Sequence, residues 1–222
     1  MSKNNFRKKL IIACDGEAAS GKSTGAKLIS KKYKLVLLNS GLLYRYASKL
    51  ILKNEPKKII PFLNREFSKT SYKKISSENL HSQEISKHVG YLAKQKKLRE
   101  LINKIQKKII KKNKRICVEG RDIASKILIK NPKYDIAFYF KCNLKEASYR
   151  RWKDLNKKVS LKDITKSLKI RTMLDKNRTH SPLKKVKDAI LIKTDKLNKA
   201  QMLNKMIYEI EKKLKLKNKN NS

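Results

Sequence analysis

The chain has few cysteines, few aromatic residues and few acidic residues, and it lacks any long hydrophobic run. Its 222 residues include three cysteines, too few and too scattered for a disulfide framework or a zinc knuckle. Cys14, Cys117 and Cys142 each fall in or at the end of a predicted buried strand, so we expect small apolar filler there. No segment approaches the roughly 20 apolar residues of a membrane span, and no apolar h-region precedes the first predicted strand. We therefore expect a cytoplasmic protein with no membrane partner.

The scarcity of acidic residues gives a formal net charge of +41, from 59 basic and 18 acidic side chains. Such a charge by itself suggests a polyanion partner, and a nucleic-acid-binding module remains an alternative. However, the charge is spread evenly along the chain, as expected of solvated surface residues. Nine Tyr, five Phe and one Trp, several of them in predicted core strands, also argue against platforms for stacked bases. We therefore do not expect nucleic-acid binding.

Five continuous apolar runs predict the strands of an α/β protein. They cover residues 10–14, 35–38, 116–118, 136–140 and 189–192. Continuous runs are typical of parallel strands covered by helices on both faces. The predicted fold is a three-layer α/β domain with a five-stranded parallel sheet, at residues 9–214, between basic, flexible termini at residues 1–8 and 215–222.

Two segments between the strands are long enough to form additional lobes. We expect an insert at about residues 41–92, followed by a helix over residues 91–112 that returns to the sheet. Residues 144–174 are helical in pattern, polar and rich in arginine, and they lie in a predicted lid at about residues 144–180.

The most specific motif follows the first predicted strand and opens a helix. Residues 16–24, GEAASGKST, match the pattern G-x-x-x-x-G-K-[ST] of a phosphate-binding P-loop. In such a loop, successive backbone N–H groups and a helix N-terminus face phosphate oxygens. We expect every residue of this loop to contact the nucleotide: Gly16, Glu17, Ala18, Ala19, Ser20, Gly21, Lys22, Ser23 and Thr24. Lys22 would reach the β- and γ-phosphates, and the Ser23 hydroxyl would ligate Mg²⁺.

Polar residues also follow the second and third predicted strands, at the edge of the sheet where α/β proteins bind ligands. Ser40, Tyr44 and Arg45 follow the second strand, and Glu119, Arg121 and Asp122 follow the third. Because only ten of the 59 basic residues are Arg, we expect them to be enriched where a phosphate needs a planar, bidentate partner. A cap by Ser40 with a solvated Arg45, and a structural ion pair of Arg121, remain the alternatives.

The predicted lid carries a second group of arginines. Arg150 and Arg151 are followed by Arg171, Asp175 and Arg178, whose spacing would place them on one face of a helix. They would then converge on one ligand, or else form a ladder of surface ion pairs.

Taken together, these motifs resemble bacterial cytidylate kinases from about residue 9 to residue 214. The P-loop, the Ser40-Gly41-x-x-Tyr44-Arg45 turn, the Gly120-Arg121-Asp122 turn and the string from Arg171 to Arg178 match that family in order and spacing. The resemblance implies transfer of a phosphoryl group from ATP, with Mg²⁺, to CMP or dCMP. It further implies a nucleoside-monophosphate-binding insert, Arg45 and Arg121 on the acceptor phosphate, and Ser40, Arg99, Asp122 and Arg178 near cytosine. Arg171 and Asp175 would lie near the ribose.

The insert departs from this family in two ways. It is short and lacks Gly-rich hairpins, and it has Gly90 where one of two serines is usual. We therefore keep another acceptor, such as AMP, UMP, shikimate or dephospho-coenzyme A, as an alternative. Lys22, Arg121, Arg150 and Arg151 are the predicted catalytic residues, with lid arginines neutralising the moving charge. We expect a monomer that acts on small-molecule substrates.

Overall fold

A computed structural model describes residues 9–219, and residues 1–8 and 220–222 lie outside the described part. The described residues form two compact units. The core unit contains residues up to Leu38 and from Lys114 onward, and the insert unit is Asn39–Asn113. Of the predicted flexible termini, residues 215–219 are helical, because the last helix runs to Lys219.

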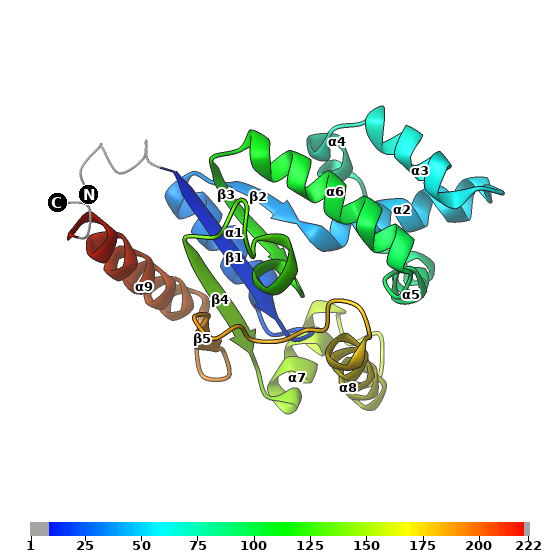
Figure 1. Ribbon diagram of the computed structural model, residues 1–222. Coiled ribbons are helices and arrows are strands. Elements are labelled where there is room, and N and C mark those ends of the chain that lie inside the picture. The colour runs from blue at the N-terminus through cyan, green and yellow to red at the C-terminus, as the bar shows by residue number, and fades with distance from the viewer. Residues whose placement is uncertain (1–8, 220–222) are drawn as a thin grey trace. The chain divides into compact units, whose positions relative to one another are not determined.

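The core unit is built on a five-stranded sheet (Figure 1). Its order is β2-β3-β1-β4-β5, and β1 pairs in parallel with β3 and β4, as β4 does with β5. The α/β class and the five strands are confirmed. The elements are β1 (Leu10–Gly16), α1 (Lys22–Tyr33), β2 (Val36–Asn39), β3 (Arg115–Gly120), η2 (Ile123–Ile127), β4 (Ile136–Lys141), α7 (Leu144–Asp154), α8 (Leu161–Asn177), β5 (Ile190–Lys193) and α9 (Lys199–Lys219).

The three central strands account for the longest apolar runs. β1 is buried along its whole length, and β3 and β4 are buried except at one end. The expectation that all five strands are fully covered was wrong for β2 and β5, which lie at the sheet edges. Val36 in β2 is 40% exposed. An apolar run therefore did not distinguish a short edge strand from a central one.

The main apolar cluster joins one face of the sheet to helices α1 and α9. Phe138 and Phe140 of β4 pack there with Ile29 of α1 and Met206 of α9. Ile123 and Ile127, buried in the π-helical turn η2, lie close to β1 and β3. This packing fixes the carboxyl ends of β1 and β3 next to the loops that carry the candidate site.

The insert unit is helical beyond Asn39, the last residue of β2. It contains α2 (Ser40–Asn54), α3 (Ile59–Ser68), α4 (Tyr72–Ser77), α5 (Gln83–Leu92) and α6 (Lys96–Lys112). The hydroxyls of Ser71 and Ser82 cap α4 and α5 by accepting the backbone N–H groups of Lys74 and Ile85. The predicted single helix over residues 91–112 was wrong at its start, because the chain turns between α5 and α6.

The segment predicted as a helical lid consists of two helices, α7 and α8. Asn156 and Lys157 adopt positive φ between them, so the helical pattern is interrupted by a turn. Asn143 and Ser160 cap the two helices by accepting the N–H groups of Glu146 and Asp163. Their apolar faces pack through Ala147, Ile164 and Leu168 against Ala18 of the P-loop. The lid helices are thus anchored to the phosphate-binding loop of the same unit.

Candidate active site

The P-loop connects β1 to α1, and two glycines are required by its geometry. A Cβ at Gly16 would lie 2.5 Å from Phe140 O, a backbone atom that cannot easily move. Gly21 precedes α1 with φ of 77°, in the left-handed region that favours glycine. Within the loop, Ser20 Oγ donates to Glu17 O at 2.9 Å. The motif therefore forms the strand, loop and helix that its spacing predicted.

Lys22 and Ser23, at the start of α1, both approach Glu119 at the end of β3. Lys22 Nζ lies 3.7 Å from Glu119 Oε2, and Ser23 Oγ donates to Glu119 Oε1 at 3.0 Å. Burial lowers the pKa of Lys22, although nearby Glu119 opposes the shift. Glu119 Oε2 is buried without a hydrogen-bond partner among the described residues. A serine hydroxyl beside a carboxylate with spare acceptor capacity fits Mg²⁺ and its bound waters.

Asp15, the single acid of β1, holds the turn after β3. Its two carboxylate oxygens accept the backbone N–H groups of Ile123 at 2.9 Å and Ala124 at 2.8 Å. Burial raises the pKa of Asp15 to about 6, although both hydrogen bonds lower it. The carboxylate thereby fixes the backbone that immediately follows Arg121 and Asp122.

Four of the predicted acceptor-binding residues meet in one cluster of the core unit. Arg121 Nε donates to Asp175 Oδ2 at 2.8 Å, and Arg178 Nη1 lies 3.6 Å from Asp175 Oδ1. Arg178 Nη2 lies 3.9 Å from Asp122 Oδ1, and Arg178 Nε donates to Ser181 O at 2.6 Å. The side chains are between 7% and 18% exposed. Two cations and two carboxylates thus lie at the edge of the sheet that carries the P-loop.

The other predicted lid residues lie in different surroundings. Arg171 is on α8, but Arg178 is one residue beyond that helix, so its reach to Asp175 does not come from a shared helical face. Among the described residues, Arg150 donates to Glu146 and to Thr194 O, directly after β5, and not to the cluster of Arg121, Asp122, Asp175 and Arg178. Arg151 is exposed. Thr24 follows Ser23 on α1, where it is half-buried.

The insert unit holds its predicted acceptor residues around helices α2, α5 and α6. Ser40 and Tyr44 are buried on α2, and Arg99 of α6 lies with Cζ 5.8 Å from the Tyr44 ring centre. Arg45 Nη1 donates to Leu80 O at 3.0 Å and to Ser86 Oγ at 2.9 Å. Arg99 Nη1 donates to Ala93 O at 3.1 Å. Tyr44 and Arg99 are therefore in contact, and Ser40 and Arg45 lie on the same helix as Tyr44.

Three residues near these groups were missed in the sequence. Asp15 directly follows the first predicted strand and was not considered as a site residue, although a buried acid next to a buried apolar run is unusual. Lys176 Nζ pairs with Glu17 Oε1 of the P-loop at 2.7 Å, and nothing marked it among 49 lysines. The Thr194 hydroxyl lies 3.1 Å from Ser20 O. Its place two residues after the fifth predicted strand was an available signal.

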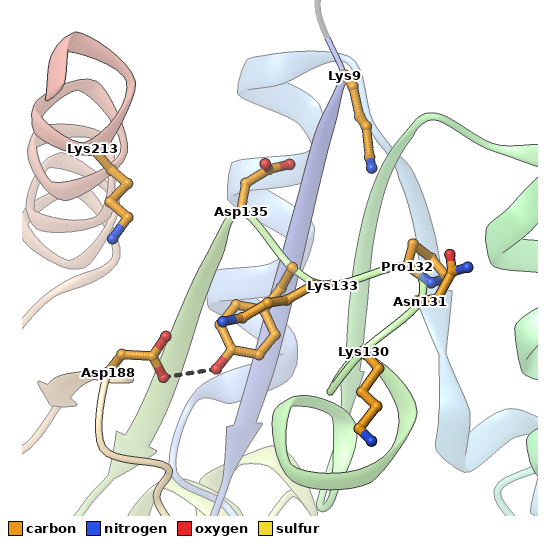
Figure 2. A pocket seen from close by; sticks show the side chains of 9 residues that line it. Lys9, Lys130, Asn131, Pro132, Lys133, Asp135, Asp188 and Lys213 are labelled. Carbon is orange, nitrogen blue, oxygen red and sulfur yellow. Dashed lines mark hydrogen bonds between the residues drawn. The ribbon is translucent and has the colours of Figure 1, made fainter. Parts of the chain in front are cut away.

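A hollow of about 530 Å³ lies at the opposite, amino ends of β1 and β4 (Figure 2). It is lined by four exposed lysines, Lys9, Lys130, Lys133 and Lys213, and by two acids, each of which accepts a hydrogen bond from the protein. Asp188 accepts the Tyr134 hydroxyl at 2.7 Å, and Asp135 accepts the N–H of Ile11 at 2.7 Å. None of the predicted site residues lines this hollow.

The sheet order, the P-loop and the arginine cluster define a P-loop kinase of the α/β class. A family model described as "Cytidylate kinase" matches residues 12–212, and the chain belongs to the cytidylate kinase family. It is 32% identical to the cytidylate kinase of Listeria monocytogenes, over 93% of this chain and 98% of that protein. It is 33% identical to the cytidylate kinase of Phytoplasma mali, over 94% and 97% of the two chains.

Solved structures agree with the fold. A crystal structure of an uncharacterized protein from Eubacterium ventriosum has a TM-score of 0.56 at 18% identity, covering 92% of this chain and 99% of that one. The Thermus thermophilus protein TT1252 has a TM-score of 0.53 at 14% identity, covering 94% and 99% of the two chains. Among the described residues, no helix is long and apolar enough to cross a membrane.

Proposed function

We propose that the protein transfers the γ-phosphoryl group of ATP to CMP or dCMP, producing ADP and CDP or dCDP. An oxygen of the acceptor phosphate attacks the γ-phosphorus in line, and the bond to the β-phosphate oxygen breaks. The observation that carries the proposal is the position of Lys22, Glu119 and Arg121 at one edge of the sheet, in a chain of the cytidylate kinase family. The acceptor is already an anionic nucleophile, so no histidine base is needed.

The P-loop residues bind the ATP phosphates in this proposal. Backbone N–H groups from Ala18 to Thr24 face phosphate oxygens, whereas the N–H of Glu17 donates to Phe140 O at 3.2 Å. Lys22 moves its ammonium from Glu119 toward the β- and γ-phosphates. Ser23 and Glu119 would hold Mg²⁺ directly or through water, and the ion supplies neutralisation of phosphate charge when bound. Within residues 9–219 no group of three or more His, Cys, Asp or Glu is placed to hold a metal ion.

The acceptor residues are assigned by the family pattern and by their neighbourhoods. Arg121 binds the acceptor phosphate, Asp122 and Arg178 lie near the base, and Arg171 and Asp175 lie near the ribose. The ion pairs of this cluster support the proposal because a phosphate can replace Asp175 as the partner of Arg121. In the insert unit, Arg45 binds the acceptor phosphate, and Ser40, Tyr44 and Arg99 contact the nucleoside.

We also propose how the whole chain operates. It is a single kinase domain over residues 9–214, with the nucleoside-monophosphate-binding insert and the lid described above. Lid closure excludes water and so suppresses ATP hydrolysis. The enzyme works as a monomer in the cytoplasm, and its positive charge is that of a solvated surface.

An acceptor panel tests the proposal. The purified protein is incubated with ATP, Mg²⁺ and one of CMP, dCMP, UMP, AMP, shikimate or dephospho-coenzyme A, and ADP formation is measured. We expect the highest kcat/KM with CMP or dCMP. A clear preference for another acceptor would replace the cytidylate assignment and leave the kinase assignment intact. Tight, steeply salt-dependent RNA binding without any acceptor activity would favour the nucleic-acid alternative.

A further inference from the structure

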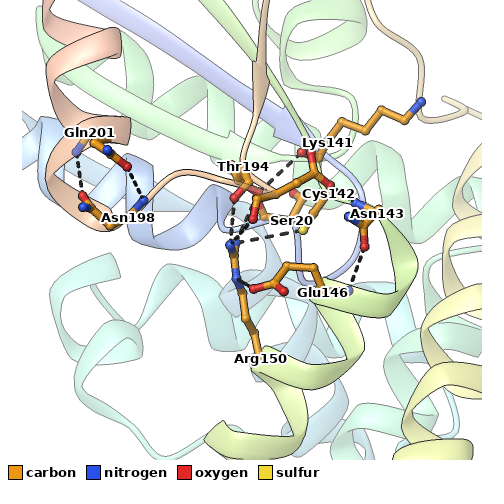
Figure 3. Close-up of polar contacts among 10 residues, drawn as sticks. Ser20, Lys141, Cys142, Asn143, Glu146, Arg150, Thr194, Asn198 and Gln201 are labelled. Carbon is orange, nitrogen blue, oxygen red and sulfur yellow. Dashed lines mark hydrogen bonds and ion pairs between the residues drawn. The ribbon is translucent and has the colours of Figure 1, made fainter.

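A polar network connects the first lid helix, α7, to the end of strand β5 (Figure 3). Arg150 Nη2 donates to two backbone carbonyls there, Thr194 O at 2.8 Å and Asp195 O at 3.2 Å. Its Nε donates to Glu146 Oε1 at 2.7 Å, and its Nη1 lies 3.4 Å from Thr194 Oγ1 and 4.0 Å from Cys142 Sγ. The five N–H groups of the guanidinium are therefore matched by five acceptors of the core unit.

Thr194 carries this network into the P-loop. Its side chain is buried, with the residue 1% exposed, and Oγ1 lies 3.1 Å from Ser20 O. Because Arg150 has only donors, the Thr194 hydroxyl accepts from it and donates its own proton to a carbonyl, of which Ser20 O at 3.1 Å is nearer than Lys141 O at 3.4 Å. The Thr194 methyl group also lies 3.7 Å from the position that a Cβ on Gly21 would take. Thr194 thus contacts Ser20 and lies beside Gly21, the two residues that immediately precede Lys22.

The same network fixes the start of α7 from its other side. Asp195 Oδ1 accepts the backbone N–H of Asn143, the residue that caps α7. That hydrogen bond is the main cause that lowers the pKa of Asp195, so this carboxylate is charged at neutral pH. The orientation of α7, the end of β5 and the P-loop backbone are therefore coupled through Arg150, Thr194 and Asp195.

We propose that Arg150 is a positioning residue that acts through Thr194 on the Ser20–Gly21 segment of the P-loop, in place of contacting the transferred phosphoryl group. This inference rests on the proposed phosphoryl transfer, and it replaces the direct charge-neutralising role expected from the sequence. A guanidinium that reached the phosphates would give up its hydrogen bonds to Thr194 and Asp195. Arg150 instead sets the position from which Lys22 and the loop N–H groups meet ATP.

A double-mutant cycle with Arg150→Met, Thr194→Val and the double variant tests the proposal. Equilibrium binding of ATP to the full chain is measured together with kcat and KM for the acceptor. We expect each single variant to weaken ATP binding about tenfold, to lower kcat and to leave the acceptor KM within twofold. The double variant should bind ATP no more weakly than the more impaired of the two single variants, because both changes break the same chain of contacts. Thr194→Ser, which keeps the hydroxyl, should bind ATP within threefold of the affinity of the native chain.

Matched controls keep the result specific. Lys145→Met removes one charge from an exposed position on α7 and should change neither ATP binding nor kcat. Arg150→Lys keeps the charge but loses the planar fork, so it should behave like Arg150→Met and carries the test if that variant fails to fold. Normal ATP binding in Thr194→Val would overturn the proposal, as would multiplied losses in the double variant. ATP binding does not depend on the acceptor, so failure to phosphorylate CMP would count against the proposed function alone.

Discussion

The candidate cations of the core unit and those of the insert unit differ in the charge of the acceptors that they contact. In the core unit, Lys22 and Arg121 each face a carboxylate, Glu119 and Asp175, and Arg121 also donates to Gly120 O at 3.2 Å. In the insert unit, Arg45 and Arg99 donate to the backbone carbonyls of Leu80 and Ala93. A carboxylate carries a charge and competes with an incoming phosphate for the cation, whereas a carbonyl is neutral. The core unit should therefore respond to the removal of a charge, and the insert unit to changes in helix geometry.

Helix α5 illustrates this role in the insert unit. Arg45 donates to Leu80 O and to Ser86 Oγ, near the start of α5, and Arg99 donates to the carbonyl of Ala93, directly after its end. The two arginines thus brace both ends of one helix. Any contact that they make with an acceptor is tied to the position of α5.

The largest expected effect is the loss of Lys22. Lys22→Ala removes the cation that Glu119 faces and the proposed partner of the β- and γ-phosphates. We expect kcat to fall about a thousandfold or more, because charge stabilisation provides most of the catalysis in phosphoryl transfer. Steady-state assays with CMP measure the loss, and Lys27→Ala, at an exposed position on the same helix, is the control. Near-normal CMP phosphorylation by Lys22→Ala would sink the proposed function.

The second effect concerns the titration of Asp15. Its native pKa of about 6, raised from 3.8 by burial, means that the folded state binds a proton that the unfolded state has released. Stability should therefore fall as pH rises from about 4 to about 6, by an amount on the order of 3 kcal/mol from this group. Urea unfolding across this range should show the slope in the native chain and a flatter one in Asp15→Asn. Asp154→Asn, at an exposed position on α7, should keep the native slope, and an unchanged slope in Asp15→Asn would contradict the assignment.

The contrast between Lys22 and Asp15 also shows what the sequence could reveal. Lys22 belongs to a loop whose geometry is local: Gly16 allows close approach to β4, Gly21 supplies the positive φ, and α1 follows at once. Its position could therefore be predicted. Asp15 precedes that loop, yet its role depends on N–H groups more than one hundred residues away. No periodicity or motif encodes such a partner.

The same reasoning applies to the arginines and to the fold. Arg121 was identified as a site candidate because it follows a buried strand, but its pairing with Asp175 depends on where α8 lies. Arg150 and Arg151 are adjacent in sequence, and only the structure shows that Arg150 joins a half-buried hydrogen-bond network while Arg151 is exposed. The five strands could be predicted from apolar runs. The break between α7 and α8 could not, because it depends on the positive φ of Asn156 and Lys157, which the helical pattern of the sequence does not show.

A smaller effect is expected where the core cluster loses one carboxylate. Asp175→Asn removes the charge that orients Arg121 and faces Arg178, leaving two cations beside each other. We expect kcat/KM for CMP to fall about ten- to a hundredfold, with ATP binding unchanged, because the damage is confined to the acceptor side. Asp163→Asn makes the same charge change at an exposed position of α8 and should leave kcat/KM unaffected. An equal loss of ATP binding in Asp175→Asn would show that the cluster serves the P-loop instead.

The smallest effect probes helix α5 of the insert unit, where charge should matter least. Gly90 is exposed in this helix, and a Cβ built there has no atom within 4 Å, so nothing in the described part of the chain requires a glycine. Gly90→Ala should raise the unfolding free energy by about 0.5 to 1 kcal/mol, through the lower backbone entropy of the unfolded chain, without changing kcat or KM. Gly90→Ser adds the hydroxyl of the serine that is usual at this position in cytidylate kinases. We expect it also to lower the KM for CMP two- to tenfold. Thermal unfolding and acceptor titration separate the two effects: an equal KM in both variants would mean that the hydroxyl makes no acceptor contact here, while destabilisation by Gly90→Ala would show that α5 needs its glycine.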